Sequence, residues 1–112
     1  MTELRAFCNH LGAFIDELAA TYPEEPDLVR AAQTLRLAKK ANPRLVFVSF
    51  KTHICDEFST HILTENEEYI RQRANRPELL VFTKHWESMS EANRSCVWKH
   101  LKVLVLLAQR IS

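Results

Sequence analysis

The chain has 112 residues, of which 46% are hydrophobic and 26% are charged, and its formal net charge is +1. This length predicts a single domain spanning residues 1–112, and the balance of apolar and charged residues excludes an intrinsically disordered chain. The only glycine, Gly12, argues against a β-sandwich or β-barrel, whose tight turns need glycine, and it excludes a glycine-rich phosphate-binding loop.

The three cysteines, Cys8, Cys55 and Cys96, form neither a CxxC pair nor a disulfide framework. They therefore predict an intracellular protein in a reducing compartment. The first residues lack the basic and apolar pattern of a signal peptide, and no apolar run reaches the roughly 18 residues of a membrane-spanning helix. We therefore expect neither secretion nor a membrane span.

The first part of the chain predicts two amphipathic helices, over residues 3–20 and 26–41. Apolar residues recur every three or four positions in both, which places them on one face of each helix. In the first helix this face comprises Leu4, Phe7, Cys8, Leu11, Phe14, Ile15, Leu18 and Ala19, and it continues to Tyr22. In the second helix it comprises Leu28, Ala31, Ala32, Leu35 and Ala38. Pro23 and Pro26 separate the helices, because proline ends one helix and suits the first turn of the next.

The segment RLVFVSF, residues 44–50, is rich in β-branched and aromatic residues, which is typical of a strand. ELLVFT, residues 78–83, could pair with it, but an isolated two-stranded sheet is only marginally stable. The residues that instead keep helical spacing across this region are Phe47, Phe50, Ile54, Phe58 and Ile62. We therefore predict one long helix over residues 43–63.

The remaining residues predict three further helices. TENE (64–67) matches a capping box, Thr64 with Glu67, ahead of a short helix that ends near Ala74. Pro77 opens the next helix, whose shared face comprises Leu79, Phe82, Trp86 and Met89. SMSE (88–91) matches a second capping box, Ser88 with Glu91, ahead of a final helix over residues 90–111. The predicted fold is all-α, a compact single-domain bundle of five or six helices.

A first candidate for chemistry is a metal site. His53, Glu57 and His61 follow one another at intervals of one helical turn, and side chains one turn apart can share a metal ion. His53 and His61, however, lie about 12 Å apart along the helix axis, so the site would need another ligand, such as His85. The alternative is that Glu57 simply hydrogen-bonds a histidine beside the apolar face.

A second candidate is the pair Cys96 and His100, also one turn apart. They could complete a metal site, or form a thiol nucleophile with its base. A half-buried cysteine more commonly packs as a small apolar residue, and no acid follows at a spacing that would orient the histidine. We therefore predict no metal, no cofactor and no catalytic residue, and we keep a metal-dependent or thiol enzyme as the alternative function.

The last helix is apolar over a wider arc than a surface helix needs. Its main face comprises Val97, Leu101, Leu104, Val105, Ala108 and Ile111. Trp98 and Val103 extend this face, and Leu106 lies among polar residues on the opposite side. Either this helix is the centre of the bundle, or Trp98, Val103 and Leu106 are covered by a partner or a second copy, because aromatic residues are enriched at interfaces. The lysines beside the face also fit a membrane-surface helix, but a free anchor would not need its own cap.

A second alternative function is weak nucleic-acid binding through Arg71, Arg73 and Arg76. A dedicated nucleic-acid-binding protein usually carries a larger basic excess, because phosphate contacts dominate its affinity. We therefore expect no nucleic-acid partner. The favoured function is that of a small non-enzymatic interaction or structural protein, which uses apolar helix faces to bind a protein partner or to self-associate.

Two segments, ICDEFSTHILTENEEYI (54–70) and FTKHWESMSEANRSCVWKHLKVLVLLAQRI (82–111), resemble small uncharacterised proteins of large double-stranded DNA viruses that infect algae and amoebae. The shared pattern is a tryptophan, a Ser-x-x-Asn-like cap and a terminal Trp-x-x-Leu-x-x-Leu helix. The matching positions are Trp86, Ser90, Asn93, Trp98, Leu101 and Leu104. The resemblance covers about half of the chain and implies no catalytic residue. It implies expression inside an infected cell, in the host cytoplasm or the virion.

Overall fold

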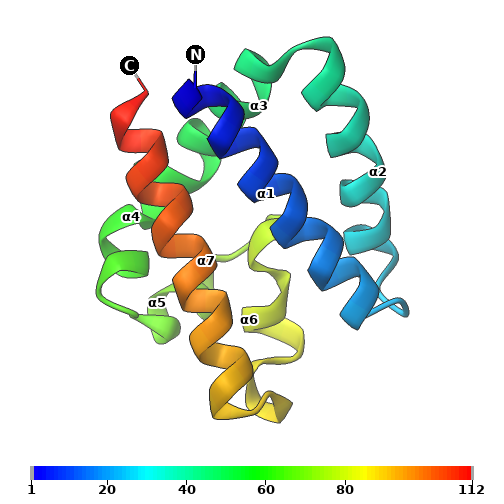
Figure 1. Cartoon of the computed structure of the whole chain (residues 1–112). Helices are drawn as coiled ribbons and strands as arrows, with labels where there is room; N and C mark the ends of the chain where they lie inside the picture. The colour runs from blue at the N-terminus through cyan, green and yellow to red at the C-terminus, as the bar shows by residue number, and fades with distance from the viewer. Residues whose placement is uncertain (1, 112) are drawn as a thin grey trace.

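Two helices of 20 residues each, α1 (Thr2–Thr21) and α7 (Glu91–Arg110), pack against each other (Figure 1). The computed structural model describes residues 2–111. α2 (Pro26–Ala41) packs against the other flank of α1, so that α1 lies between α7 and α2 (Figure 1). The apolar faces predicted for α1 and α2 are buried or half-buried, because burying one face is what stabilises an amphipathic helix. Both predicted helices are confirmed.

The segment with the strand-like composition is helical. α3 (Pro43–Phe50) continues through a π-helical turn (Lys51–Cys55) into α4 (Asp56–Leu63), and the backbone stays in the right-handed helical region at both junctions. Asn42 caps α3, because its side-chain oxygen accepts a hydrogen bond from the backbone N–H of Leu45 at 3.2 Å. The five apolar residues with helical spacing are all buried, and their burial outweighs the strand propensity of the individual residues. The predicted long helix is confirmed.

The chain reverses after α4 in a Schellman motif. The N–H of Glu65 donates to the backbone oxygen of Ile62 at 3.2 Å, and the N–H of Asn66 donates to that of His61 at 2.8 Å. Glu65 itself has a φ of 56°, in the left-handed region that glycine usually occupies at this position. These two hydrogen bonds satisfy carbonyl groups that the end of a helix leaves without an intrahelical partner.

The capping box predicted for Thr64 and Glu67 is wrong. Thr64 still belongs to the end of α4, where its hydroxyl donates to the backbone oxygen of Thr60 at 2.8 Å. The N-cap of α5 (Glu67–Arg73) is Asn66, whose side-chain oxygen accepts from the N–H of Tyr69 at 3.3 Å. The reversal at Glu65 delays the start of the helix, and the residue directly before it takes over the cap.

Three short helical pieces replace the predicted helix that begins at Pro77. A 3-10 turn (Pro77–Leu79) leads into α6 (Leu80–Lys84), and a second 3-10 turn (Trp86–Ser88) follows. The predicted apolar face nevertheless points into the core, with Met89 half-buried and the other members buried.

The second predicted capping box is also misplaced. The N-cap of α7 is Ser90, whose hydroxyl oxygen accepts a hydrogen bond from the N–H of Asn93 at 3.1 Å. Ser88 is not the cap, because it lies in the preceding 3-10 turn and its hydroxyl donates to the backbone oxygen of His85 at 3.0 Å.

The buried faces of these helices meet in one core. Part of it is aromatic, since Phe82 stacks on Trp86 with ring centroids 4.3 Å apart, and Trp98 lies edge-on to Trp86 at 5.4 Å. The radius of gyration of 13.2 Å matches the roughly 13 Å expected for a compact chain of this length. Residues 2–111 form six helices, with α3 to α4 counted as one, and no strand, which confirms the all-α fold. None of the helices in this range is long and apolar enough to cross a membrane.

Candidate functional site

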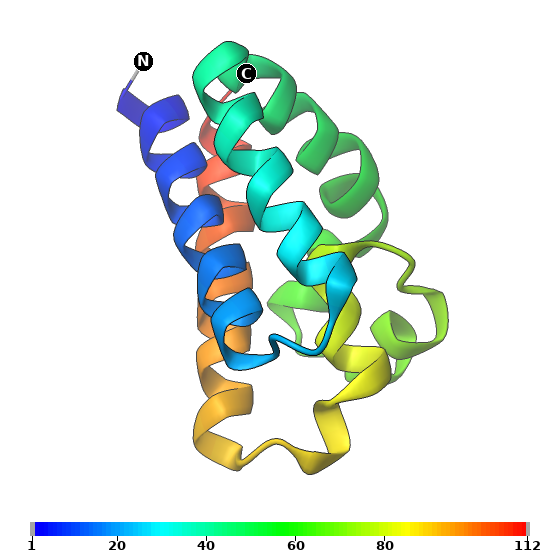
Figure 2. The same cartoon turned by 90° about the vertical axis from the view of Figure 1, so that its right-hand side faces the viewer.

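A groove of about 400 Å³ lies between α2 and α3 and is bordered by the 3-10 turn at Pro77. Figure 2 faces the side of the molecule on which these two helices lie next to each other. The apolar lining of the groove comprises Leu11, Ile15, Ala31, Leu35, Ala38, Leu45, Val46, Phe50 and Pro77. Ala31 and Ala38 face the groove with single methyl groups, so they leave open the space that larger side chains would fill.

Large apolar side chains are exposed on the helices that form this groove. Leu45, in the groove lining, is 57% exposed, and Leu37 and Val48 are 73% and 45% exposed. Single exposed leucines are ordinary on protein surfaces. Leu45 is different because it lies in the lining of an apolar groove, and the two helices that enclose this groove also expose Leu37 and Val48 outside the lining, which makes this side of the molecule a candidate binding surface. We refer to the groove with Leu37, Leu45 and Val48 as the α2–α3 surface.

The groove also carries charged groups, near the start of α2. Asp27 and Arg30 form an ion pair at 3.3 Å, and Arg76 lies 3.6 Å from Glu78. The Nε atom of Arg76 and the Oε1 atom of Glu78 are buried and have no hydrogen-bond partner among residues 2–111. The lining therefore combines a long apolar stretch with polar groups of both signs, a combination typical of ligand grooves.

The structure does not bring the three predicted metal ligands of the long helix together. His53 is exposed, and His61 stacks on Tyr69 with ring centroids 3.6 Å apart. Glu57 accepts a hydrogen bond from the Tyr69 hydroxyl at 3.5 Å and pairs with Arg73 at 3.5 Å. Glu57 is therefore engaged by partners outside its own helix that sequence spacing could not reveal.

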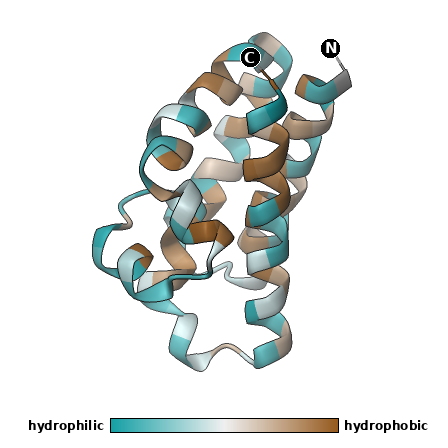
Figure 3. Cartoon of the chain, turned by 90° about the vertical axis from the view of Figure 1, so that its left-hand side faces the viewer, coloured by the Kyte–Doolittle hydropathy of each residue, from teal (hydrophilic) through white to brown (hydrophobic). Residues whose placement is uncertain are grey.

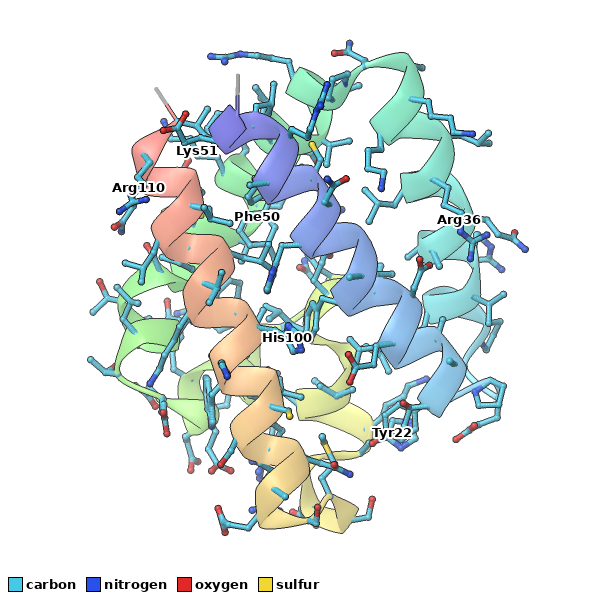
Figure 4. All side chains as sticks on the ribbon, viewed as in Figure 1. Tyr22, Arg36, Phe50, Lys51, His100 and Arg110 are labelled. Atoms are coloured by element: carbon cyan, nitrogen blue, oxygen red, sulfur yellow. The ribbon has the colours of Figure 1, made fainter. Side chains whose placement is uncertain are left out.

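His100 points from α7 toward α1 (Figure 4). Its Nδ1 lies 3.1 Å from Nε2 of His10, its Nε2 lies 3.7 Å from Glu17, and its ring stacks on Phe14. Burial and the neighbouring His100 lower the pKa of His10. Cys96 is exposed and lines a small cavity of about 80 Å³ together with His100 and Glu17.

The other two thiols are poor nucleophiles. Cys8 is buried, and its pKa is raised by burial. Burial raises the pKa of Cys55 to about 11, with a smaller contribution from the nearby charge of Asp56. Both thiols are therefore protonated at neutral pH, whereas the thiolate is the nucleophilic form.

His85 has partners that lie far away in the sequence. Its Nε2 lies 2.7 Å from a carboxylate oxygen of Glu25, and its ring stacks on Tyr22 with centroids 4.0 Å apart. Lys84 donates to the other oxygen of Glu25 at 3.2 Å. The hydrogen bond with His85, and then that with Lys84, hold the pKa of Glu25 below its ordinary value. Sequence reasoning singled out His85 but not Glu25.

The interface candidates of α7 lie in different surroundings. Trp98 is buried by this chain's own Phe82 and Trp86, so it offers no surface to a partner. Val103 is half-buried and Leu106 is 51% exposed. Figure 3 shows that the apolar residues of α7 concentrate toward its C-terminal half. The remaining exposed candidate on this helix is Leu106.

The arginines considered for nucleic-acid binding are paired with carboxylates. Arg71 lies 2.8 Å from Glu67, and Arg73 lies 3.5 Å from Glu57. Arg76 faces Glu78 in the groove. These pairs neutralise the patch on which phosphate binding would depend.

No protein-family model matches the chain, and no curated protein or solved structure matches it. The groove of the α2–α3 surface combines an apolar lining, the exposed Leu45 and polar groups of both signs. Any ligand of this surface therefore has to be inferred from the shape and chemistry of the surface itself.

Proposed function

We propose that this protein is a non-enzymatic interaction module that binds an amphipathic helix of a partner protein on its α2–α3 surface. The observation that carries the proposal is the apolar groove of about 400 Å³ with the exposed Leu45 in its lining, on two helices that also expose Leu37 and Val48. Covering these side chains would remove apolar area from water, which is the main driving force of protein association.

The length of the groove supports a helix as the ligand. Its lining on α2 extends from Asp27 to Ala38, which corresponds to about 16 Å along the helix axis. Three turns of a partner helix have this length and would place apolar anchors at positions i, i+3 or i+4, and i+7 along the groove. A polar residue at one end of that helix could then reach Arg76 and Glu78.

A partner helix fits this surface better than a second copy of the chain does. A stable dimer buries about 800 Å² on each subunit, across a broad face. The exposed large apolar residues are instead divided between the α2–α3 surface and two residues on other helices, Leu63 and Leu106. Self-association is therefore an outcome of the test and not the proposal itself.

The experiment selects binders from a displayed library of amphipathic helical peptides and maps the best one by amide chemical shifts. We expect shifts along α2 and α3, and we expect Leu45→Asp to weaken binding about tenfold or more, because it places an unpaired charge in an apolar contact. Leu106→Asp is the matched control, since this leucine is similarly exposed but lies on α7.

Three results would contradict the proposal. One is the absence of any selected peptide. Another is a set of shifts centred on α4 and α7, with loss of binding in Leu106→Asp. The third is a dimer in light scattering that Leu45→Asp converts to a monomer, because a second copy would then be the natural occupant of this surface.

We also propose, from the resemblance of residues 54–70 and 82–111 alone, that the protein acts inside cells infected by a large double-stranded DNA virus. The three free thiols are compatible with a reducing compartment. Immunoblots of infected algal or amoebal cells test this, and a signal of equal strength in uninfected cells would contradict it.

A further inference from the structure

Three side chains with metal-binding groups converge where the α1–α2 connection meets the end of α6. One donor atom from each of Glu24, Glu25 and His85 lies within 4.8 Å of the other two. Glu24 and Glu25 are adjacent in the chain, whereas His85 comes from 60 residues beyond Glu25. We propose that these three residues bind a Zn²⁺ ion, a function that is independent of the α2–α3 surface.

Backbone hydrogen bonds fix the main chain at two of the three proposed ligands, Glu25 and His85. Glu25 is the N-cap of α2, where its N–H donates to the oxygen of Tyr22 at 3.0 Å and its oxygen accepts from Leu28 at 3.2 Å. The N–H of His85 donates to the oxygen of Val81 at 3.0 Å, and the imidazole ring stacks on Tyr22. Two of the three ligands are thus fixed by hydrogen bonds and packing before any ion binds, which favours binding by preorganisation.

The donor set suits zinc. One imidazole nitrogen and two carboxylate oxygens are established Zn²⁺ ligands, and three protein ligands leave a position open for water. Bond lengths of about 2.0–2.2 Å place two ligands of one ion no more than about 4.4 Å apart. A rotation of Glu24, whose side chain is exposed, would close the set, provided that the 2.7 Å hydrogen bond between His85 and Glu25 opens to admit the ion.

The ion pair of Lys84 with Glu25 shows that a positive charge is favourable beside the Glu25 carboxylate. The Nζ atom of Lys84 lies 3.2 Å from Glu25, while its side chain is 55% exposed and can swing into solvent. Lys84 is therefore a competitor of the ion, because a dication beside Glu25 would repel the ammonium group. Removing this ammonium group should tighten zinc binding.

Calorimetric titration of the full chain with Zn²⁺ tests the site. We expect one ion per chain, and we expect His85→Gln and Glu24→Gln each to weaken binding about tenfold or more, since even the loss of an outer partner costs that much. Lys84→Met should strengthen binding. Gln at position 85 can still donate to Glu25, and Glu24 is exposed, so both variants should keep the fold, which circular dichroism verifies.

Cys96→Ser is the control, because Cys96 and His100 line one cavity and could bind zinc at a second place in the molecule. Binding that is retained in Cys96→Ser and lost in His85→Gln supports the site. Binding that is lost in Cys96→Ser but unchanged in His85→Gln overturns it. Equal binding by wild type and Lys84→Met also overturns it, as does the absence of binding by the wild-type chain.

Discussion

The backbone of Glu65 is held in a costly conformation. The left-handed region costs a residue other than glycine about 1–2 kcal/mol. The Lys102 ammonium group lies 2.6 Å from the Glu65 carboxylate, but both side chains are partly exposed, so this ion pair contributes at most about 1 kcal/mol. The conformation persists because the hydrogen bonds that end α4 require it.

Two substitutions at this position separate the backbone from the ion pair. Glu65→Gly and Glu65→Ala both remove the contact with Lys102, but only glycine adopts a positive φ without strain. We expect the glycine variant to have a free energy of unfolding about 1 kcal/mol higher than that of the alanine variant. Urea denaturation measures the difference, and equal stability of the two variants would show that the left-handed conformation carries no strain.

Among the helices, the start of α7 shows how local hydrogen bonds decide an element's boundary. Ser88 and Ser90 both precede the apolar run, and only the structure distinguishes them. The hydroxyl oxygen of Ser90 accepts from the N–H of Asn93, which satisfies one of the donors that the first turn of a helix leaves unpaired.

We expect Ser90→Ala to lower the free energy of unfolding by about 1 kcal/mol, because the N–H of Asn93 loses its partner. Ser88→Ala is the matched control and should change stability by less than about 0.5 kcal/mol, as for an ordinary surface substitution. Thermal unfolding followed by circular dichroism compares the two. A larger loss in Ser88→Ala would place the cap where the sequence pattern alone puts it.

The positions of the helices could be predicted from the sequence more accurately than the residues at which the helices begin and end. The long helix through residues 43–63 could be predicted because Phe47, Phe50 and Phe58 keep helical spacing, and buried side chains dominate local preferences. The caps at Thr64 and Ser88 could not be placed correctly, since two suitable residues stand two positions apart and the turn between the helices selects one of them. At Glu65 the turn uses a positive φ, which is rare for glutamate and therefore could not be predicted from the residue type.

At the scale of the whole molecule, the first and last helices are linked through two histidines. His10 on α1 and His100 on α7 are separated by 90 residues, yet their ring nitrogens lie 3.1 Å apart. The spacing of residues along one helix cannot reveal such a pair, and the same holds for Glu25 and His85. The candidate groove likewise depends on how α2 and α3 pack against each other, and the pattern of residues along each helix does not reveal this packing.

This link predicts that stability depends on pH. Burial and His100 lower the pKa of His10 below its ordinary value of 6.5, so the unfolded chain binds more protons than the folded chain in mildly acidic solution. The contribution of His10 to stability is therefore complete above pH 6.5 and decreases as the pH falls toward the folded-state pKa.

Urea denaturation at several pH values between neutral and mildly acidic measures this dependence. We expect His10→Gln to reduce the loss of stability on acidification, since glutamine does not take up a proton. His53→Gln, at an exposed position, should keep the wild-type dependence. An unchanged pH dependence in His10→Gln would show that the pair of histidines does not couple protonation to folding.

The chain has two tryptophans, and both lie in the same part of the core. Their ring centroids are 5.4 Å apart, although Trp86 belongs to the turn after α6 and Trp98 belongs to α7. Because both indole rings lie at this one place, the tryptophan fluorescence of the protein reports on a single location in the core. The protein therefore contains its own optical reporter of whether α7 is docked, without any attached label.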